Sequence, residues 1–176
     1  MSNQPNIQRE RSGQNRFIEK VGRLFLDSGT QAILLHRVAH FFYRLKVPLI
    51  PTIIRRGNFF LTGADIYPSC QLGKDVHFIH SAGIIIADNS IIGDNCEIFG
   101  QVVLGGRGGN HEEDGAPIIG NNTVLCIGAK VLGPVTIGQN VTVAACAVVL
   151  SSIPDNSLAA GIPATVKTVY KQEKNS

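Results

Sequence analysis

The chain has 176 residues, a formal net charge of +3 and 44% hydrophobic residues. This length supports one main domain, and a mild charge without a basic block argues against a nucleic-acid partner. Only 6% of the residues are aromatic and tryptophan is absent, which suits a narrow aliphatic core. No segment is apolar and long enough to span a membrane, and the polar start is unlike a signal peptide, so we expect a cytoplasmic protein.

The first third of the chain is predicted to be helical after a disordered start at residues 1–14. Apolar residues recur at helical spacing in 16–26 and again in 31–45, and Asp27 to Thr30 supply a stop and an N-cap between them. A third helix is expected from residue 50 to 61. Residues 15–62 are therefore predicted to form a short helical cap, whose basic character also allows it to approach a membrane surface.

A six-residue repeat dominates residues 63–165. A bulky aliphatic or aromatic residue recurs every six positions, and a small, β-branched or turn-forming residue follows four positions later. Each unit indicates a short strand and a tight corner, so three units make one triangular coil with the repeated residues inside. These anchors are Ile66, Leu72, Phe78, Ile84, Ile119, Leu125, Val131, Ile137, Val143 and Val149.

The repeat has two irregular features. Ser90 and Cys96 stand where an aliphatic residue is expected, but the six-residue phase is predicted to continue through them to Val102. Residues 107–116 are polar and rich in glycine, and they are predicted to form a loop that leaves one corner. Such loops on a rigid scaffold often carry function. Residues 166–176 are expected to be a basic C-terminal tail.

Four cysteines are spread through the chain without a CxxC pair. Three of them fall at or beside repeat positions where a small buried residue fits. We interpret them as reduced thiols of the core. They are Cys70, Cys96, Cys126 and Cys146.

Several motifs resemble, in order and spacing, the serine acetyltransferase family of hexapeptide-repeat acyltransferases. They are the segments 28–40, 61–68, 78–80, 103–106, 128–133 and 161–164. Within this family the chain looks closest to surface-polysaccharide acetyltransferases of the colanic acid type. The resemblance implies a mainly β fold, a left-handed parallel β-helix, with acetyl-CoA as donor, a hydroxyl as acceptor and a homotrimeric assembly.

The family's catalytic pair falls on His80 and Asp65. An alcohol is a poor nucleophile at neutral pH, and histidine is the side chain suited to removing its proton there. A neighbouring carboxylate orients the imidazole and stabilises the imidazolium. Asp65 precedes His80 by fifteen residues, which places it about one strand spacing, roughly 4.8 Å, below His80.

The family holds CoA in a groove between neighbouring solenoids, largely through backbone groups at small-residue corners. Gly105, Gly106 and Ala145 match such positions, although corner geometry alone also favours small residues. Lys130 is expected to face the pantetheine or phosphate end. No metal is expected.

Two departures from serine-specific members led us to predict a carbohydrate acceptor. Ile79 stands where those members carry an aspartate, and Gly115 and Ala116 stand where they carry arginine and histidine. A zwitterionic acceptor then lacks its charged partners, at a cost of roughly 1.5–3 kcal/mol for each hydrogen bond to a charge. We therefore predict sugar acetylation in surface-polysaccharide synthesis, with acceptor contacts from His77, His111 and Asp114.

Three other functions remain open from the sequence. The first is serine O-acetylation, with residues of the 107–116 loop replacing the missing charges. The second is a trimeric zinc enzyme of the same fold that uses His77, His80 and His111, although their spacing is not typical of zinc ligands. The third is an inactive scaffold.

Overall fold

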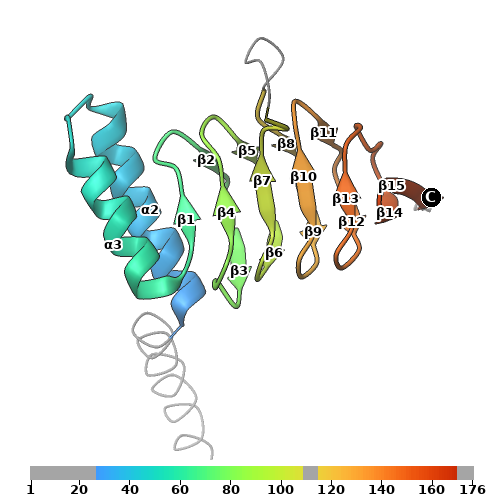
Figure 1. Cartoon of the computed structure of the whole chain (residues 1–176), viewed down its shortest axis with the longest axis horizontal. Coiled ribbons are helices and arrows are strands. Elements are labelled where there is room, and N and C mark those ends of the chain that lie inside the picture. Colours follow the sequence, from blue (N-terminus) through green and yellow to red (C-terminus); the bar gives the residue numbers. More distant parts are fainter. Residues whose placement is uncertain (1–26, 109–114, 170–176) are drawn as a thin grey trace, which may run out of the picture.

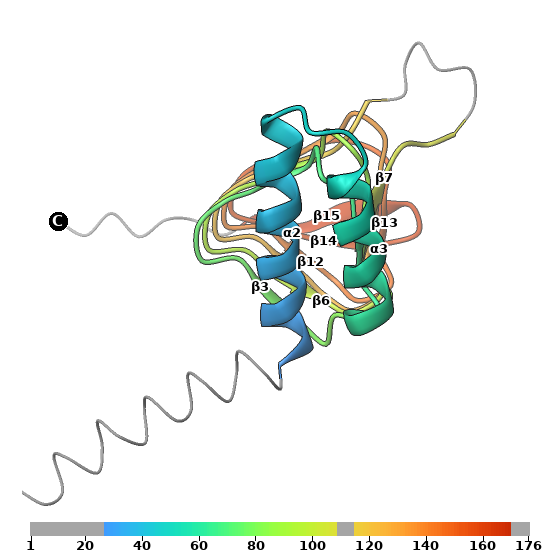
Figure 2. The ribbon, with the colours of Figure 1, turned by 90° about the vertical axis from the view of Figure 1, so that its left-hand side faces the viewer.

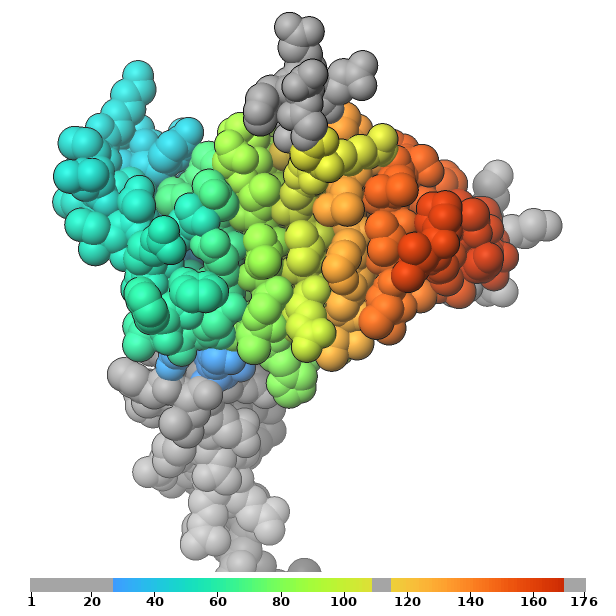
Figure 3. Space-filling view, viewed as in Figure 1, coloured from blue at the N-terminus to red at the C-terminus, as the bar shows by residue number. Residues whose placement is uncertain are grey.

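The computed structural model describes residues 27–108 and 115–169. Helices α2 (Ser28–Arg44) and α3 (Ile50–Thr62) stand at one end, and short strands wind away from them toward the C-terminus (Figure 1). In the space-filling view the described chain advances in successive bands from the helices to the last strands (Figure 3). The disordered segment 1–14 and the helix 16–26 that the sequence predicts lie outside the described residues.

Both helices begin and end at residues that explain their limits. The carboxylate of Asp27 caps α2 by accepting from the backbone N–H of Thr30 at 3.0 Å, so α2 begins at Ser28, three residues before the predicted start. Pro51 lies in the first turn of α3, where its missing N–H costs nothing. Gly63 ends α3 in the left-handed region with φ 75°.

The two helices lie side by side across the open end of the first coil (Figure 2). Asn58 of α3 is buried, and its side-chain amide donates to the carbonyl oxygen of Ala32 in α2 at 2.9 Å. At the start of α2, a Cβ on Gly29 would lie 2.0 Å from the carbonyl oxygen of Phe78. Only glycine permits this contact, so the cap rests directly on the backbone of the first coil.

The strands form three flat faces, each a ladder of strands from successive coils. We name them faces A, B and C in chain order. Face A contains β1 (Asp65–Ile66), β4 (Ile85–Ile86), β7 (Val103–Gly105), β10 (Lys130–Leu132) and β13 (Val148–Val149). Face B contains β2 (Gln71–Leu72), β5 (Ile91–Ile92), β8 (Ile118–Ile119) and β11 (Thr136–Ile137). Face C contains β3 (His77–Ile79), β6 (Glu97–Phe99), β9 (Val124–Leu125), β12 (Thr142–Val143), β14 (Ser157–Gly161) and β15 (Ala164–Val169).

All neighbouring strands are parallel except the last pair, in which β15 runs antiparallel to β14. The interior holds the repeated apolar side chains, which are almost fully buried from Ile66 to Val149 except for the half-buried Leu72. The predicted class, a mainly β hexapeptide-repeat β-helix with a helical cap, is confirmed. The sequence predicts a tail from residue 166. In the structure, residues 166–169 belong to strand β15 (Ala164–Val169).

The predicted phase of the repeat is wrong in the second coil. Asp65 lies opposite Ile85, twenty residues on, whereas Ile85 lies opposite Val103 after eighteen. Two extra residues occupy the corner after β3, so the strand anchors shift by two positions. The anchors in this coil are Ile86, Ile92, Ile98 and Leu104, and Ser90 and Cys96 are small, buried corner residues.

The loop predicted at residues 107–116 leaves the corner between β7 and β8. Val103 pairs with Lys130, twenty-seven residues on, so this coil has nine residues more than the regular eighteen. The pairing on either side stays in register, because Ile91 still lies opposite Ile118. An insertion at a corner therefore leaves the faces intact.

Asparagines form a hydrogen-bonded column along the corner between faces B and C. Asn95 donates through Nδ2 to Asn122 at 3.3 Å, Asn122 to Asn140 at 3.2 Å, and Asn140 to Asn156 at 2.9 Å. Each has a positive φ near 55°, a conformation that asparagine tolerates better than most residues. We call this column the asparagine ladder.

The cysteines divide between core and surface. All four are free thiols; Cys70 and Cys96 are buried, as predicted, and burial raises the pKa of the Cys70 thiol to about 12. Cys126 is partly exposed and Cys146 is exposed. The core prediction is wrong for Cys146 because it stands on a corner with φ 57°. Neither described helix is long and apolar enough to cross a membrane.

Candidate functional site

His80 stands on the corner between β3 and β4, which carries the two extra residues of the first coil. The side chain is exposed, and the backbone has φ 58°, a left-handed conformation that other corners of the solenoid, such as those at Asp75 and Asn95, also adopt. Left-handed non-glycine residues persist only where their surroundings hold them. The corner therefore presents the imidazole outward on a backbone that its neighbours must fix.

Two contacts hold this corner. Ser81 is fully buried, and its hydroxyl donates to the carbonyl oxygen of Thr62 at 2.7 Å. On the other side, a Cβ on Gly100 would lie 2.5 Å from the carbonyl oxygen of His80. The corner is thus clamped between the end of α3 and the second coil, and Gly100 is the residue type that this close approach requires.

Asp65 begins β1 and flanks the stacked corners of the first and second coils. Gly83 donates to the carbonyl oxygen of Gly63 at 2.9 Å, which places the His80 corner directly on the turn before Asp65. The two predicted catalytic residues therefore lie on the same edge of the solenoid, one coil level apart. Among the described residues, however, Asp65 forms its ion pair with Arg55 and none with His80.

Arg55 of α3 binds both carboxylate oxygens of Asp65 through one edge of its guanidinium. Nε donates to Oδ1 at 2.6 Å and an Nη to Oδ2 at 2.8 Å. The guanidinium also lies over the Tyr67 ring, 3.4 Å from its centroid, a cation–π contact. The hydrogen bond to Asp65 raises the pKa of Arg55. A carboxylate has about four acceptor positions, so Asp65 retains capacity for a donor such as an imidazole N–H.

The residues predicted to bind CoA fall on two different edges. Lys130 and Ala145 are exposed along the edge between faces C and A, the edge that carries His80. The ammonium of Lys130 donates to the carbonyl oxygen of Gly128 at 3.1 Å. Gly105 ends β7 and Gly106 follows it, at the opposite edge of face A. A single chain does not bring these two groups together.

The local backbone does not require a glycine at position 105. A Cβ there would meet only the methyl group of Ala87, at 3.8 Å, and its φ lies outside the left-handed region. The corner-geometry explanation therefore does not account for this glycine. A bare backbone on this edge is what a close approach by a ligand or a second chain needs.

The predicted acceptor residues are dispersed. His77 is exposed at the start of β3, at the far end of the strand from His80. Ile79 is half-buried next to His80, and Gly115 and Ala116 lie just before β8, at the corner opposite the His80 edge of face A. His111 and Asp114 lie outside the described residues.

Sequence reasoning missed three residues that build the site. Arg55 gave no signal because its spacing to Asp65 crosses the helix–solenoid junction. Gly100 and Ser81 gave a weak signal, since the two-residue change of phase after Phe78 marks an irregular corner there. Within residues 27–108 and 115–169, no three His, Cys, Asp or Glu side chains gather as metal ligands would.

Comparison with known proteins identifies the type of solenoid. Residues 116–151 match the family model described as bacterial transferase hexapeptide, with six repeats. The solenoid is of the hexapeptide-transferase type. This chain is also 40% identical over 140 residues to a serine acetyltransferase of Synechococcus elongatus, a match that covers 78% of this chain and 56% of that protein.

Solved structures of serine acetyltransferases are also similar to this chain. A serine acetyltransferase from Brucella abortus in complex with coenzyme A matches with a TM-score of 0.82 and 30% identity, over 86% of this chain and 60% of that one. A soybean serine acetyltransferase complexed with serine matches with a TM-score of 0.79 and 32% identity, over 82% and 59%. This chain therefore spans about three fifths of the length of these relatives.

These relatives correct the functional prediction. The predicted carbohydrate acceptor and the role in polysaccharide synthesis are contradicted, because the matched proteins are named serine acetyltransferases. The suggested nearness to surface-polysaccharide enzymes is likewise unsupported. The absence of charges at Ile79, Gly115 and Ala116 was the reason for that prediction.

Proposed function

We propose that this chain is an acetyl-CoA-dependent O-acetyltransferase that uses serine as acceptor. The observation that carries the proposal is the 40% identity with a serine acetyltransferase over 140 residues, a stretch that spans most of this chain. The corner that clamps His80 supports it, because it presents an imidazole at the surface with a carboxylate on the same edge.

His80 is the general base of the proposed reaction. The imidazole accepts the proton of the acceptor hydroxyl as the oxygen attacks the thioester carbonyl of acetyl-CoA. The tetrahedral intermediate then collapses, the C–S bond breaks, and the departing thiolate takes the proton back from the imidazolium. Acetyl is transferred to oxygen, CoA leaves as its thiol, and His80 returns to its neutral form.

Asp65 and Arg55 act on His80 in this proposal. Asp65 accepts a hydrogen bond from the imidazole and stabilises the transient imidazolium, as the carboxylate of a catalytic triad does. Arg55 fixes the rotamer of Asp65 through two charge-assisted hydrogen bonds, which are more directional than a single contact. Arg55 is thus a positioning residue.

The proposed assembly is a homotrimer with the donor groove between chains. His80, Lys130 and Ala145 lie on one edge of face A, and Gly105 and Gly106 lie on the other. A neighbouring solenoid that sets its Gly105 edge against the Ala145 edge would complete a groove lined by small residues. Backbone N–H groups near Gly105 and Gly106 would then be available to the thioester oxygen.

The 107–116 loop is the proposed source of charges for serine. Ile79, Gly115 and Ala116 offer no charged group to the ammonium and carboxylate of the amino acid. The sequence of the loop contains both signs, with Arg107 as its first residue and three carboxylates after it. A zwitterion needs such partners, because desolvating unpaired charges is costly.

The test is release of CoA thiol from acetyl-CoA by the full chain with L-serine. We expect saturable turnover with kcat/KM of at least about 10⁴ M⁻¹ s⁻¹. His80→Ala should lower the rate about 10²- to 10⁴-fold while CoA still binds. Lys167→Ala, exposed on β15, is the control. Thiol release no faster with serine than without it would overturn the acceptor, and near-full activity of His80→Ala would overturn the base.

A further inference from the structure

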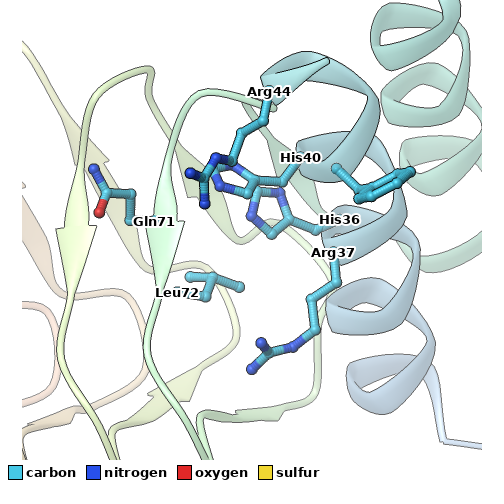
Figure 4. Close-up of a pocket in the computed structure, with 7 residues that line it drawn as sticks. His36, Arg37, His40, Arg44, Gln71 and Leu72 are labelled. Carbon is cyan, nitrogen blue, oxygen red and sulfur yellow. The ribbon is translucent and has the colours of Figure 1, made fainter.

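A pocket lies between α2 and β2, away from the His80 corner. Its volume is about 340 Å³, within the range of roughly 300–1,000 Å³ that small-ligand sites occupy. Basic, imidazole and amide side chains point into it (Figure 4), and no carboxylate lines it. The lining residues are His36, Arg37, His40, Phe41, Arg44, Gln71 and Leu72.

Two arginines of this pocket have no carboxylate partner among the described residues, where the single ion pair is that of Arg55. Arg37 donates through one Nη to the carbonyl oxygen of Gly73 at 2.8 Å, which directs the guanidinium along β2 and leaves its other N–H groups available. Asp75 lines a neighbouring pocket that Arg37 also lines, and it forms no ion pair with Arg37. The pocket therefore holds a net positive charge.

His36 supplies an unsatisfied buried group at the base of this pocket. The residue is 2% exposed, and its Nδ1 has no hydrogen-bond partner. Its Nε2 lies 3.6 Å from the sulfur of Cys70, a thiol that is protonated because burial raises its pKa to about 12. If the thiol donates to Nε2, the proton of the neutral ring is on Nδ1. An N–H without an acceptor then faces a basic pocket.

His40 lies beside His36 with a fixed orientation and with its proton on Nδ1, so the Nε2 of the neutral ring accepts rather than donates. Its Nδ1 donates to the carbonyl oxygen of Pro68 at 2.8 Å, and its ring centroid lies 5.9 Å from that of His36. The imidazoles of His36 and His40 and the guanidinium groups of Arg37 and Arg44 thus line one space, and only His36 among them is buried. Buried polar groups are nearly always paired in native proteins, so the Nδ1 of His36 calls for a partner, and the two exposed arginines beside it favour an anionic one.

We propose that the pocket between α2 and β2 binds the phosphate group of a small-molecule ligand. The planar fork of arginine matches the oxygen geometry of phosphate, and the pocket offers donors from both of its walls. The bound group would link α2 to β2, the strand that leads through β3 to His80. The proposal does not depend on the acetyl-transfer reaction.

The experiment is calorimetric titration of the full chain with inorganic phosphate and with pyrophosphate at constant ionic strength, with chloride as the blank. We expect saturable binding of at least one of the two at millimolar concentration or below. Arg37→Gln and Arg44→Gln should each weaken it about ten-fold or more, the value of one charge-assisted hydrogen bond. Arg56→Gln removes an exposed arginine of α3 outside the pocket and should leave the affinity unchanged.

Imidazole resonances provide a second measurement that does not require the variants to fold. Phosphate should shift the NMR signals of His36 and His40 in the wild-type chain and leave that of His77 in place. Absence of saturable binding of both anions, unshifted His36 and His40 signals, or equal weakening by Arg56→Gln would each overturn the proposal.

Discussion

Arg55 holds Asp65 by two hydrogen bonds of 2.6 and 2.8 Å, and so joins the helical cap to the first strand of the solenoid. Their side chains are 17% and 29% exposed, so water screens the pair only in part. A cap helix therefore sets the rotamer of a proposed catalytic carboxylate. The helices do more than cover an open edge.

Replacing Arg55 should affect turnover more than donor binding. Arg55→Gln removes the charge and the fork, and Asp65 then rotates more freely beside His80. We expect kcat to fall about ten-fold, the value of roughly one hydrogen bond to a charge, with KM for acetyl-CoA unchanged. Arg55→Lys, which keeps the charge without the fork, should be intermediate. An unchanged kcat in Arg55→Gln would show that Asp65 needs no such support.

Gly100→Ala should displace the His80 corner. The added Cβ would lie 2.5 Å from the His80 carbonyl oxygen, and overpacking of this kind costs about 1–3 kcal/mol. We expect a lower midpoint of thermal unfolding and at least about a ten-fold loss of activity. Gly105→Ala is the matched control for stability, since its Cβ meets only Ala87 at 3.8 Å. Equal midpoints for the two variants would contradict the clamp.

Burial of His36 predicts a loss of stability in mild acid. Desolvation lowers the pKa of His36 from 6.5 to about 4, so between these values the unfolded chain binds more protons than the folded one. The free energy of unfolding should therefore fall as the pH drops from 6.5 to 4, by at most about 3 kcal/mol. Denaturant titrations of His36→Gln in phosphate-free buffer should show a flatter dependence. A slope identical to wild type would refute this assignment.

Light scattering should report a particle of three chains or a multiple of three. The argument is the separation of Lys130 and Ala145 from Gly105 and Gly106 on opposite edges of face A, which one chain cannot close into a groove. A monomer that still turns over acetyl-CoA would contradict the shared groove. Gly105→Arg should weaken CoA binding by filling that edge.

Ile79→Asp should raise kcat/KM for L-serine. Ile79 is half-buried beside His80 at the end of β3, where a carboxylate could pair with the ammonium group. One charge-assisted hydrogen bond of about 1.5 kcal/mol corresponds to a gain of about ten-fold. Ile79→Asn, isosteric and uncharged, is the control. A decrease with aspartate would indicate that the ammonium is bound elsewhere.

The fold could be predicted from the sequence because every anchor residue of the repeat occupies the same kind of position, inside the solenoid. Ile119, Leu125 and Val131 recur at six residues and all point inward, so periodicity alone predicts coils. It failed at the corner after β3, because small residues such as Ser90 and Cys96 satisfy both a corner position and an imperfect anchor position. Only strand pairing distinguishes the two.

For the candidate site, the sequence predicted only the relative placement of two residues. Motif spacing proposed His80 and Asp65 and placed them on neighbouring coil levels, which the strand register reproduces. The contact of Asp65 with Arg55 depends on how α3 docks, and no local pattern encodes that docking. Gly105 and Lys130 were proposed as one groove, yet they occupy separate edges of face A. If the groove is shared between chains, as proposed above, no residue spacing within one chain would indicate it.

The asparagine ladder and the inserted loop lie at different corners of the solenoid. The bond from Asn95 to Asn122 spans the coil that carries the nine inserted residues, and it remains in line with the bonds above it. The insertion leaves a different corner, so its length and composition can change while every rung of the ladder stays in place. The length and composition of this loop can therefore be changed by mutation while the strand pairing of the solenoid is kept.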